Sequence, residues 1–196
     1  MAVAFPIALH LEGKACLVVG SNEEAAERAR ALSDVGAQVE VVTPRPGLGL
    51  AAVIGSRGLV HHQREFAPSD LDGKWLAVLT DHDLALGAAM AQAAEQRRVL
   101  FCATDQPQNN SFSHMAQARA GLVTVCISTN GRAPALGRRL REELGRVLAD
   151  AGLARFADEL AELRERTPSA ERHDVLGAAV AGVYFEGRLL LPGERR

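Results

Sequence analysis

The segment from residue 15 to residue 43 constrains the fold more than any other part of this chain. An apolar run, Ala15–Val19, ends at Gly20, and a polar turn follows it. From Ala25 onward apolar residues recur with helical spacing, and a second apolar run begins after Gly36. This order predicts a strand, a tight turn, a helix and a second strand, the unit from which parallel α/β sheets are built.

The turn in this unit has part of the glycine pattern of a dinucleotide-binding site. That pattern, G-x-G-x-x-G/A, places phosphates on the free amides of a helix N-terminus. Gly20 and Ala25 match its first and third positions, whereas Asn22 occupies the second. The candidate cofactor-binding residues of the turn are therefore Gly20, Ser21, Asn22, Glu23, Glu24 and Ala25.

Two further features of the turn leave its role open. Ser21 followed by Glu24 has the form of a capping box, which predicts that the helix begins at Ser21. Glu23 and Glu24 place carboxylates where the helix dipole would favour phosphate. The segment can therefore be read as a dinucleotide site or as a capped turn that binds nothing.

The rest of the chain alternates between strand and helix patterns. Apolar runs predict strands at Leu59–Phe66, Trp75–Leu79, Val99–Ala103 and Gly121–Ser128. Helical patterns cover Leu84–Gln96, Pro134–Ala149, Leu153–Arg166 and Ala170–Phe185, with a shorter one near Ala51–Ile54 and a loose tail from Leu191 to Arg196. The fold class expected is α/β, a Rossmann-like doubly wound parallel sheet followed by further helices.

Polar residues follow several of these predicted strands. Ligands of such sheets bind beyond the carboxyl ends of the strands. Besides Gly20, the residues at those ends are Thr43, Thr80, Asp81 and Asp105. We therefore expect a ligand cleft at this edge of the sheet.

Composition narrows the classes of protein that the chain can belong to. A formal net charge of −2 over 196 residues gives no basic footprint for nucleic acid. No apolar run reaches the ~20 residues of a membrane span, and the first residues lack the pattern of a signal peptide. The three cysteines, Cys16, Cys102 and Cys126, lie in strand-like runs, which predicts buried, reduced thiols in a cytoplasmic protein.

Two other patterns favour structural roles. His61 and His62 would point to opposite faces of a strand, so we interpret them as surface histidines rather than as ligands of one metal. Leu136, Leu140, Leu144 and Leu148 recur at every fourth position, which is typical of a core face or a subunit contact. No clustered His and Cys pattern supports a resident metal site.

The motifs together resemble the precorrin-2 dehydrogenase family of siroheme synthesis, which includes the amino-terminal module of siroheme synthases and stand-alone versions of it. The resemblance covers about residues 5–148. It rests on the order and spacing of these blocks: Phe5-Pro6-Ile7; Val18-Val19-Gly20 with Ala25 and Arg28; Gly36-Ala37-Gln38-Val39; Arg64-Glu65-Phe66; Asp70-Leu71; Trp75-Leu76; Thr80-Asp81; Asp105; Ser111-Phe112; Ile127-Ser128-Thr129; and Pro134 with Leu136, Arg138, Leu140 and Arg141.

This resemblance implies an NAD-dependent dehydrogenation of precorrin-2 to sirohydrochlorin by a homodimer, and some family members also insert ferrous iron. It assigns a catalytic carboxylate to Asp105, cofactor contacts to Thr43, Pro44, Thr80 and Asp81 besides the turn, and substrate contacts to Ser111, Ser128, Thr129, Asn130 and Gly131. It also implies an NAD-binding domain at 1–112, a dimerisation segment at 113–149 and a helical domain at 150–196.

The chain also departs from the family pattern at some positions near the expected cofactor. Ser21-Asn22 replaces a glycine-rich turn, and His82 and Leu86 stand where the family tends to carry an aspartate and an asparagine. An alternative therefore remains, a non-catalytic relative that binds a tetrapyrrole or acts as an assembly partner. Thr43 and Arg45 leave the choice between NAD and NADP open. His82 and His114, with Asp105, are the candidates for handling iron.

Overall fold

The computed structural model describes residues 4–186, 189 and 191. The chain groups into two compact units that divide between His114 and Met115, and each unit is described by itself. The domain boundary expected between residues 149 and 150 falls within the second unit and stays a prediction.

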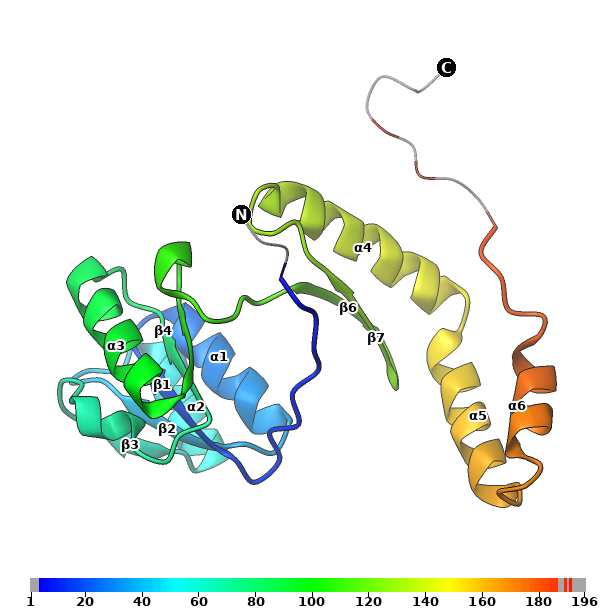
Figure 1. Cartoon of the computed structure of the whole chain (residues 1–196), viewed down its shortest axis with the longest axis horizontal. Coiled ribbons are helices and arrows are strands. Elements are labelled where there is room, and N and C mark those ends of the chain that lie inside the picture. The colour runs from blue at the N-terminus through cyan, green and yellow to red at the C-terminus, as the bar shows by residue number, and fades with distance from the viewer. Residues whose placement is uncertain (1–3, 187–188, 190, 192–196) are drawn as a thin grey trace. The chain divides into compact units, whose positions relative to one another are not determined.

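The first unit is a five-stranded parallel sheet covered by helices (Figure 1). Its strands are β1 Ala15–Val19, β2 Gln38–Val42, β3 Val60–His62, β4 Leu76–Leu79 and β5 Leu100–Ala103, and its helices are α1 Glu23–Asp34, α2 Leu48–Arg57 and α3 Leu84–Arg97, with 3₁₀ turns at Pro68–Leu71 and Pro107–Asn109. The strand order is β3-β2-β1-β4-β5, and every neighbouring pair is parallel. The predicted α/β class with a parallel sheet is confirmed.

The two faces of this sheet bury separate apolar cores, because successive strand residues point to opposite faces. Val18 of β1 packs with Ala29 of α1 and Val53 of α2 on one face. Leu17 packs with Met90 of α3 on the other. The helices therefore flank the sheet on both sides, as a doubly wound fold requires (Figure 1).

Two elements of the first unit differ in length from the sequence prediction. The strand expected over Leu59–Phe66 is limited to β3, Val60–His62. The short helix expected near Ala51–Ile54 extends over α2, Leu48–Arg57, and Gly58 ends it in a left-handed conformation with φ 61°. Glycine adopts this conformation without a steric penalty, so it terminates the helix.

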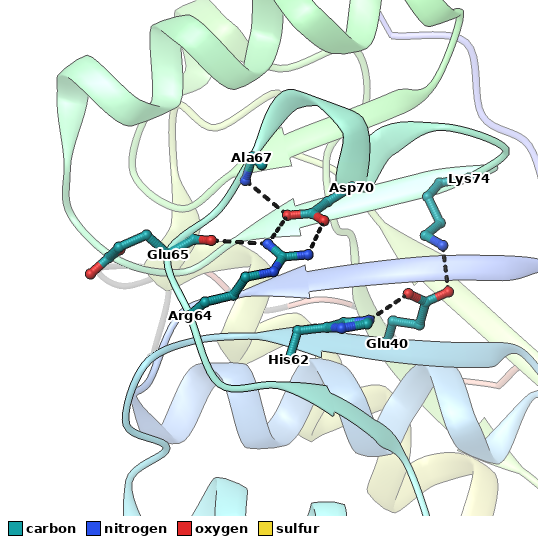
Figure 2. Close-up of polar contacts among 7 residues, drawn as sticks. All are labelled: Glu40, His62, Arg64, Glu65, Ala67, Asp70 and Lys74. Atoms are coloured by element: carbon teal, nitrogen blue, oxygen red, sulfur yellow. Dashed lines mark hydrogen bonds and ion pairs between the residues drawn. The ribbon is translucent and has the colours of Figure 1, made fainter.

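Polar contacts hold the segment after β3 in place and link Glu40 of β2 to its neighbours (Figure 2). Arg64 donates two hydrogen bonds to the Asp70 carboxylate, at 2.8 and 2.6 Å. The same carboxylate accepts a hydrogen bond from the Ala67 amide. These three contacts hold the chain after His62 against the 3₁₀ turn. Glu40 on β2 accepts hydrogen bonds from Lys74 and from the His62 ring, the latter at 3.0 Å.

The two paired histidines are structural, but they are half-buried rather than on the surface as expected. The His61 ring nitrogen lies 2.9 Å from the Thr43 carbonyl oxygen, while His62 contacts Glu40. They bind different partners, as their opposite orientations on a strand require.

The cysteines are free thiols, and they differ in exposure. Cys16 and Cys102 are buried, and burial raises the pKa of each thiol to about 11. The prediction of a buried thiol is wrong for Cys126, which is exposed. It alternates along its strand with the packed residue Val125, so its side chain lies on the outer face.

The second unit contains a hairpin and three helices (Figure 1). The elements are β6 Ala116–Ala120, β7 Val123–Ile127, α4 Pro134–Asp150, α5 Leu153–Arg166 and α6 Arg172–Val180. Strand β6 is absent from the sequence prediction; it pairs antiparallel with β7 through the two-residue turn Gly121-Leu122. The last helix ends at Val180 rather than at Phe185, and residues 192–196 of the predicted tail lie outside the described residues.

The leucine stripe of α4 is only partly a core face. Leu148 is buried against Ala118 and Ala120 of the hairpin, and Leu144 packs at the edge of this cluster. Leu136, one end of the stripe, is 48% exposed within the chain. The stripe therefore leaves an apolar surface on α4.

Candidate active site

The turn between β1 and α1 lies where the strand order of the sheet reverses. β1 pairs with β2 on one side and with β4 on the other, so the crevice beyond these strands is the topological switch point. Gly20 has φ 138°, and a Cβ atom there would lie 2.1 Å from Thr80 Oγ1. Glycine is therefore required at this position by the approach of β4 alone, whether or not a phosphate binds.

Asn22, rather than Ser21, caps α1. The Asn22 side-chain oxygen accepts the Ala25 amide at 2.9 Å, and its nitrogen donates to the Thr80 carbonyl at 2.8 Å. The capping box predicted at Ser21 is wrong, because the helix starts one residue later and Asn22 is a strong cap. The Ser21 backbone is occupied instead: its amide donates to Asp81 and its carbonyl accepts from Gly47.

Two backbone donors of this turn remain available to a ligand. In the described part of the chain no acceptor contacts the Glu23 and Glu24 amides, which belong to the helix turn that lacks intrahelical partners. The Glu23 carboxylate lies against Gly49, where an added Cβ would meet its oxygen at 2.1 Å. The Glu24 carboxylate forms an ion pair with Arg28 at 2.8 Å. Both carboxylates thus have neighbours, but their charge still opposes phosphate.

The end of β2 borders the same turn. Thr43 is buried, and its amide donates to the His62 carbonyl of β3, whereas Pro44 is exposed. Gly47, three residues beyond Pro44, donates to Ser21 at 2.8 Å. The segment after β2 is therefore held beside the turn, where Rossmann folds carry the residues that contact the cofactor ribose.

The ends of β4 and β5 bring two further polar side chains together. Asp105 follows β5 in a left-handed conformation, with φ 57°, and its side chain is 80% exposed. His82 follows β4, and its Nδ1 atom lies 3.8 Å from Asp105 Oδ2. Since Asp81 next to His82 binds the Ser21 amide, one continuous edge connects the β1–α1 turn with Asp105. A carboxylate held there and open to solvent can accept a proton.

Gln106 also belongs to this edge, although no sequence pattern predicts it. It is 1% exposed, among the largest fully buried side chains, and contacts the N-terminal turn of α3. A polar residue in a loop rich in Asn and Gln carries no sequence signal for burial. Only Gly87, a glycine inside a helical pattern, hints that another group approaches there closely.

The predicted substrate residues fall into both units. In the first, the Ser111 hydroxyl accepts the Phe101 amide at 2.8 Å, a contact along the outer edge of β5. In the second, the predicted residues form the turn between β7 and α4, in which the Ser128 hydroxyl accepts the Asn130 amide at 3.2 Å. Asn130 and Gly131 are left-handed, with φ 50° and 72°. The Thr129 hydroxyl accepts the Ala133 amide.

The side chains named for iron handling do not form a cluster. In residues 4–186, 189 and 191, no three His, Cys, Asp or Glu side chains gather as metal ligands. His114 stacks edge-on against Phe112, with ring centroids 5.2 Å apart.

Among the described residues, no helix combines the length and apolar character needed to cross a bilayer.

Comparison with known proteins shows the family of the first unit. Residues 7–116 match a family model whose description reads "Putative NAD(P)-binding". The chain belongs to this NAD(P)-binding family. Residues 123–146 match a second model, described as "Sirohaem biosynthesis protein central", which covers β7 and most of α4.

Curated relatives of this chain include siroheme synthases. Siroheme synthase 3 of Aeromonas hydrophila is 36% identical over 159 residues, which are 80% of this chain and 34% of that protein. Siroheme synthase 1 of Aeromonas salmonicida is 36% identical over 192 residues, 90% of this chain and 40% of that protein. The chain thus spans 34% and 40% of the length of these two siroheme synthases. These matches confirm the resemblance inferred from the motifs.

A solved structure supports the fold. The protein described as SirC, precorrin-2 dehydrogenase, superimposes with a TM-score of 0.74 over 90% of this chain and 89% of that one, at 21% identity. The likeness therefore extends beyond the Rossmann-like unit into the hairpin and the helices that follow.

Proposed function

We propose that this chain is an NAD-dependent precorrin-2 dehydrogenase that forms sirohydrochlorin in siroheme biosynthesis. The observation that carries the proposal is the position of Asp105. Its exposed carboxylate stands on the edge of the sheet that also holds the β1–α1 turn of an NAD(P)-binding module. The matches to siroheme synthases and to the central sirohaem model supply the substrate class.

The groups at this edge would have separate roles in a dehydrogenation. Removal of two hydrogens from the macrocycle releases a hydride and a proton, and bound NAD⁺ supplies the acceptor for the hydride. The Glu23 and Glu24 amides would bind the pyrophosphate, with Gly20 allowing the close packing of the turn. Asp105 would accept the proton, with the His82 ring beside it, Nδ1 lying 3.8 Å from Asp105 Oδ2.

The proposal extends to assembly and location. We infer a homodimer, because the second unit buries little apolar surface of its own and leaves Leu136 exposed. We place the protein in the cytoplasm, which the free thiols of Cys16, Cys102 and Cys126 support. Insertion of ferrous iron into sirohydrochlorin is a second activity to be tested on the same protein.

An anaerobic incubation of the purified protein with precorrin-2 and NAD⁺ tests the activity. The expected result is the absorption spectrum of sirohydrochlorin together with NADH formation in equal amounts. Addition of Fe²⁺ to the completed reaction then tests chelation. If folded protein at high concentration produces no spectral change, the chain is a non-catalytic relative. Binding of the tetrapyrrole without turnover would identify that alternative directly.

A further inference from the structure

Gln106 connects the loop that carries Asp105 to helix α3. Its side-chain nitrogen donates to the Asp83 carbonyl at 3.2 Å, and its side-chain oxygen accepts from Asn109 at 2.9 Å. Asp83 is the N-cap of α3, so Gln106 is seated on the first turn of that helix. Both polar groups of this buried amide therefore have partners, which a stable buried position requires.

The space for this side chain exists because residue 87 is glycine. A Cβ atom on Gly87 would lie 1.9 Å from the Gln106 side-chain oxygen and 2.8 Å from its amide carbon. Gly87 has no positive φ, so its backbone does not call for glycine. The glycine inside α3 is explained by the approach of Gln106, at a cost in helix propensity of about 1 kcal/mol.

Further contacts hold the loop on either side of Asp105. The Thr104 amide donates to Leu79 of β4 at 2.9 Å, and the Asn109 amide donates to the Gln106 carbonyl at 2.9 Å. Asp105 itself has a left-handed backbone, with φ 57°, a conformation that aspartate adopts more readily than most non-glycine residues. Its side chain is 80% exposed, so the backbone of this loop determines the position from which the carboxylate extends.

We propose that Gln106 is the positioning residue that holds Asp105 beside His82 in the orientation needed for proton transfer. This inference rests on the proposed dehydrogenase function. Gln106 touches neither the proposed cofactor turn nor the exposed carboxylate. It acts by fixing the backbone of Asp105 to the first turn of α3, which follows His82 in the chain.

Replacement of Gln106 tests this role, with a matched change in the same loop as control. Gln106→Ala removes both hydrogen bonds, and Gln106→Met removes them at nearly constant volume. Gln108→Ala alters an exposed glutamine two residues away. We expect both Gln106 variants to lower kcat about tenfold or more, because a catalytic group misplaced by ~1 Å can cost ~100-fold in rate. NAD⁺ affinity should be unchanged, and Gln108→Ala should behave as wild type.

The Asp105→Asn background separates positioning from general stability. If Gln106 acts through Asp105, adding Gln106→Met to Asp105→Asn should change the residual rate by less than about twofold. An equal fold-loss in both backgrounds, accompanied by a lower melting temperature, would show a merely structural role and overturn the inference.

Hydrogen exchange provides a readout that does not depend on the substrate. Gln106→Met should speed amide exchange at Asn109 and Asn110, whereas Gln108→Ala should not. Unchanged exchange would show that Gln106 does not hold the loop. A wild-type protein that fails to oxidise precorrin-2 refutes the proposed function, and the exchange result then decides the inference by itself.

Discussion

Glu24 places a negative charge at the end of α1 that would hold the proposed cofactor's pyrophosphate. It lies in the first turn of α1, with its carboxylate paired to Arg28. We predict that Glu24→Val lowers the Kd for NAD⁺ about two- to fivefold, since a charge at a helix terminus contributes about 0.3–1 kcal/mol. Isothermal titration calorimetry measures the effect. The control is Glu27→Val, which removes an exposed carboxylate three residues further along α1. Equal affinity in all three proteins would contradict the placement of the pyrophosphate.

Asp70 gives a second prediction at the scale of single residues. The Arg64 hydrogen bonds, assisted by the Ala67 amide, lower the pKa of Asp70 below its ordinary range. A carboxyl group with a depressed pKa stabilises the fold above its unfolded-state pKa, and this contribution is lost as the pH falls through the folded-state value. Asp70→Asn should therefore lower the free energy of unfolding by about 1 kcal/mol at pH 7.

Urea unfolding at neutral and acidic pH measures this difference. The wild-type protein and Asp70→Asn should converge as Asp70 becomes protonated, below the ordinary pKa of an aspartate. Asp72→Asn removes an exposed ion pair with Arg97 and should cost little at either pH. A difference that persists undiminished in acid would mean that the Asp70 charge is not the source of the stabilisation.

At the scale of elements, the start of α1 is the most instructive case. The motif places a helix after the glycine, and this is what the structure shows, but the cap is Asn22 because its side chain also reaches the Thr80 carbonyl of β4. A side chain that satisfies a neighbouring strand cannot be anticipated from local spacing. Strand β6 was missed for a similar reason: alternating Ala, Gln and Arg has weak strand propensity, and only pairing with β7 makes it a strand.

The position of the cap can be tested directly. Asn22→Ala removes the helix cap and the hydrogen bond to Thr80, so we expect it to lower the melting temperature by about 2–4 °C for each ~1 kcal/mol lost. Ser21→Ala should leave the melting temperature unchanged, because the described contacts of Ser21 use its backbone. Circular dichroism melts compare the two variants. A larger loss in Ser21→Ala would restore the capping box as the start of the helix.

The candidate site shows the same limit on sequence reasoning. Strand ends could be located from apolar runs, so Thr80, Asp81 and Asp105 were correctly placed at the edge of the sheet. The position of Gln106 could not be predicted in this way, since its burial depends on a contact between the end of β5 and helix α3. Patterns along the chain locate the elements approximately. Packing between elements decides which polar side chains are enclosed.

At the scale of the whole molecule, the second unit has a small hydrophobic core. The buried apolar side chains among its described residues are Ala118, Ala120 and Leu148. We predict that the chain is a homodimer with a two-fold interface built from residues 123–128 and the helices after them. Leu136→Asp should shift sedimentation toward the monomer, while Leu84→Asp, which alters a more exposed leucine of the first unit, should not. A monomeric wild-type protein at micromolar concentration would contradict this.

The outer edge of β5 has a consequence for how the protein behaves in concentrated solution. The outward amides and carbonyls of Phe101 and Ala103 are taken up by Ser111 and Asn110. At the opposite border, β3 is only three residues long. An open sheet normally offers unpaired edges on which another chain can add a strand, the first step of aggregation. This sheet closes one border with its own loop and shortens the other, so the Rossmann-like unit resists growth by strand addition on both sides.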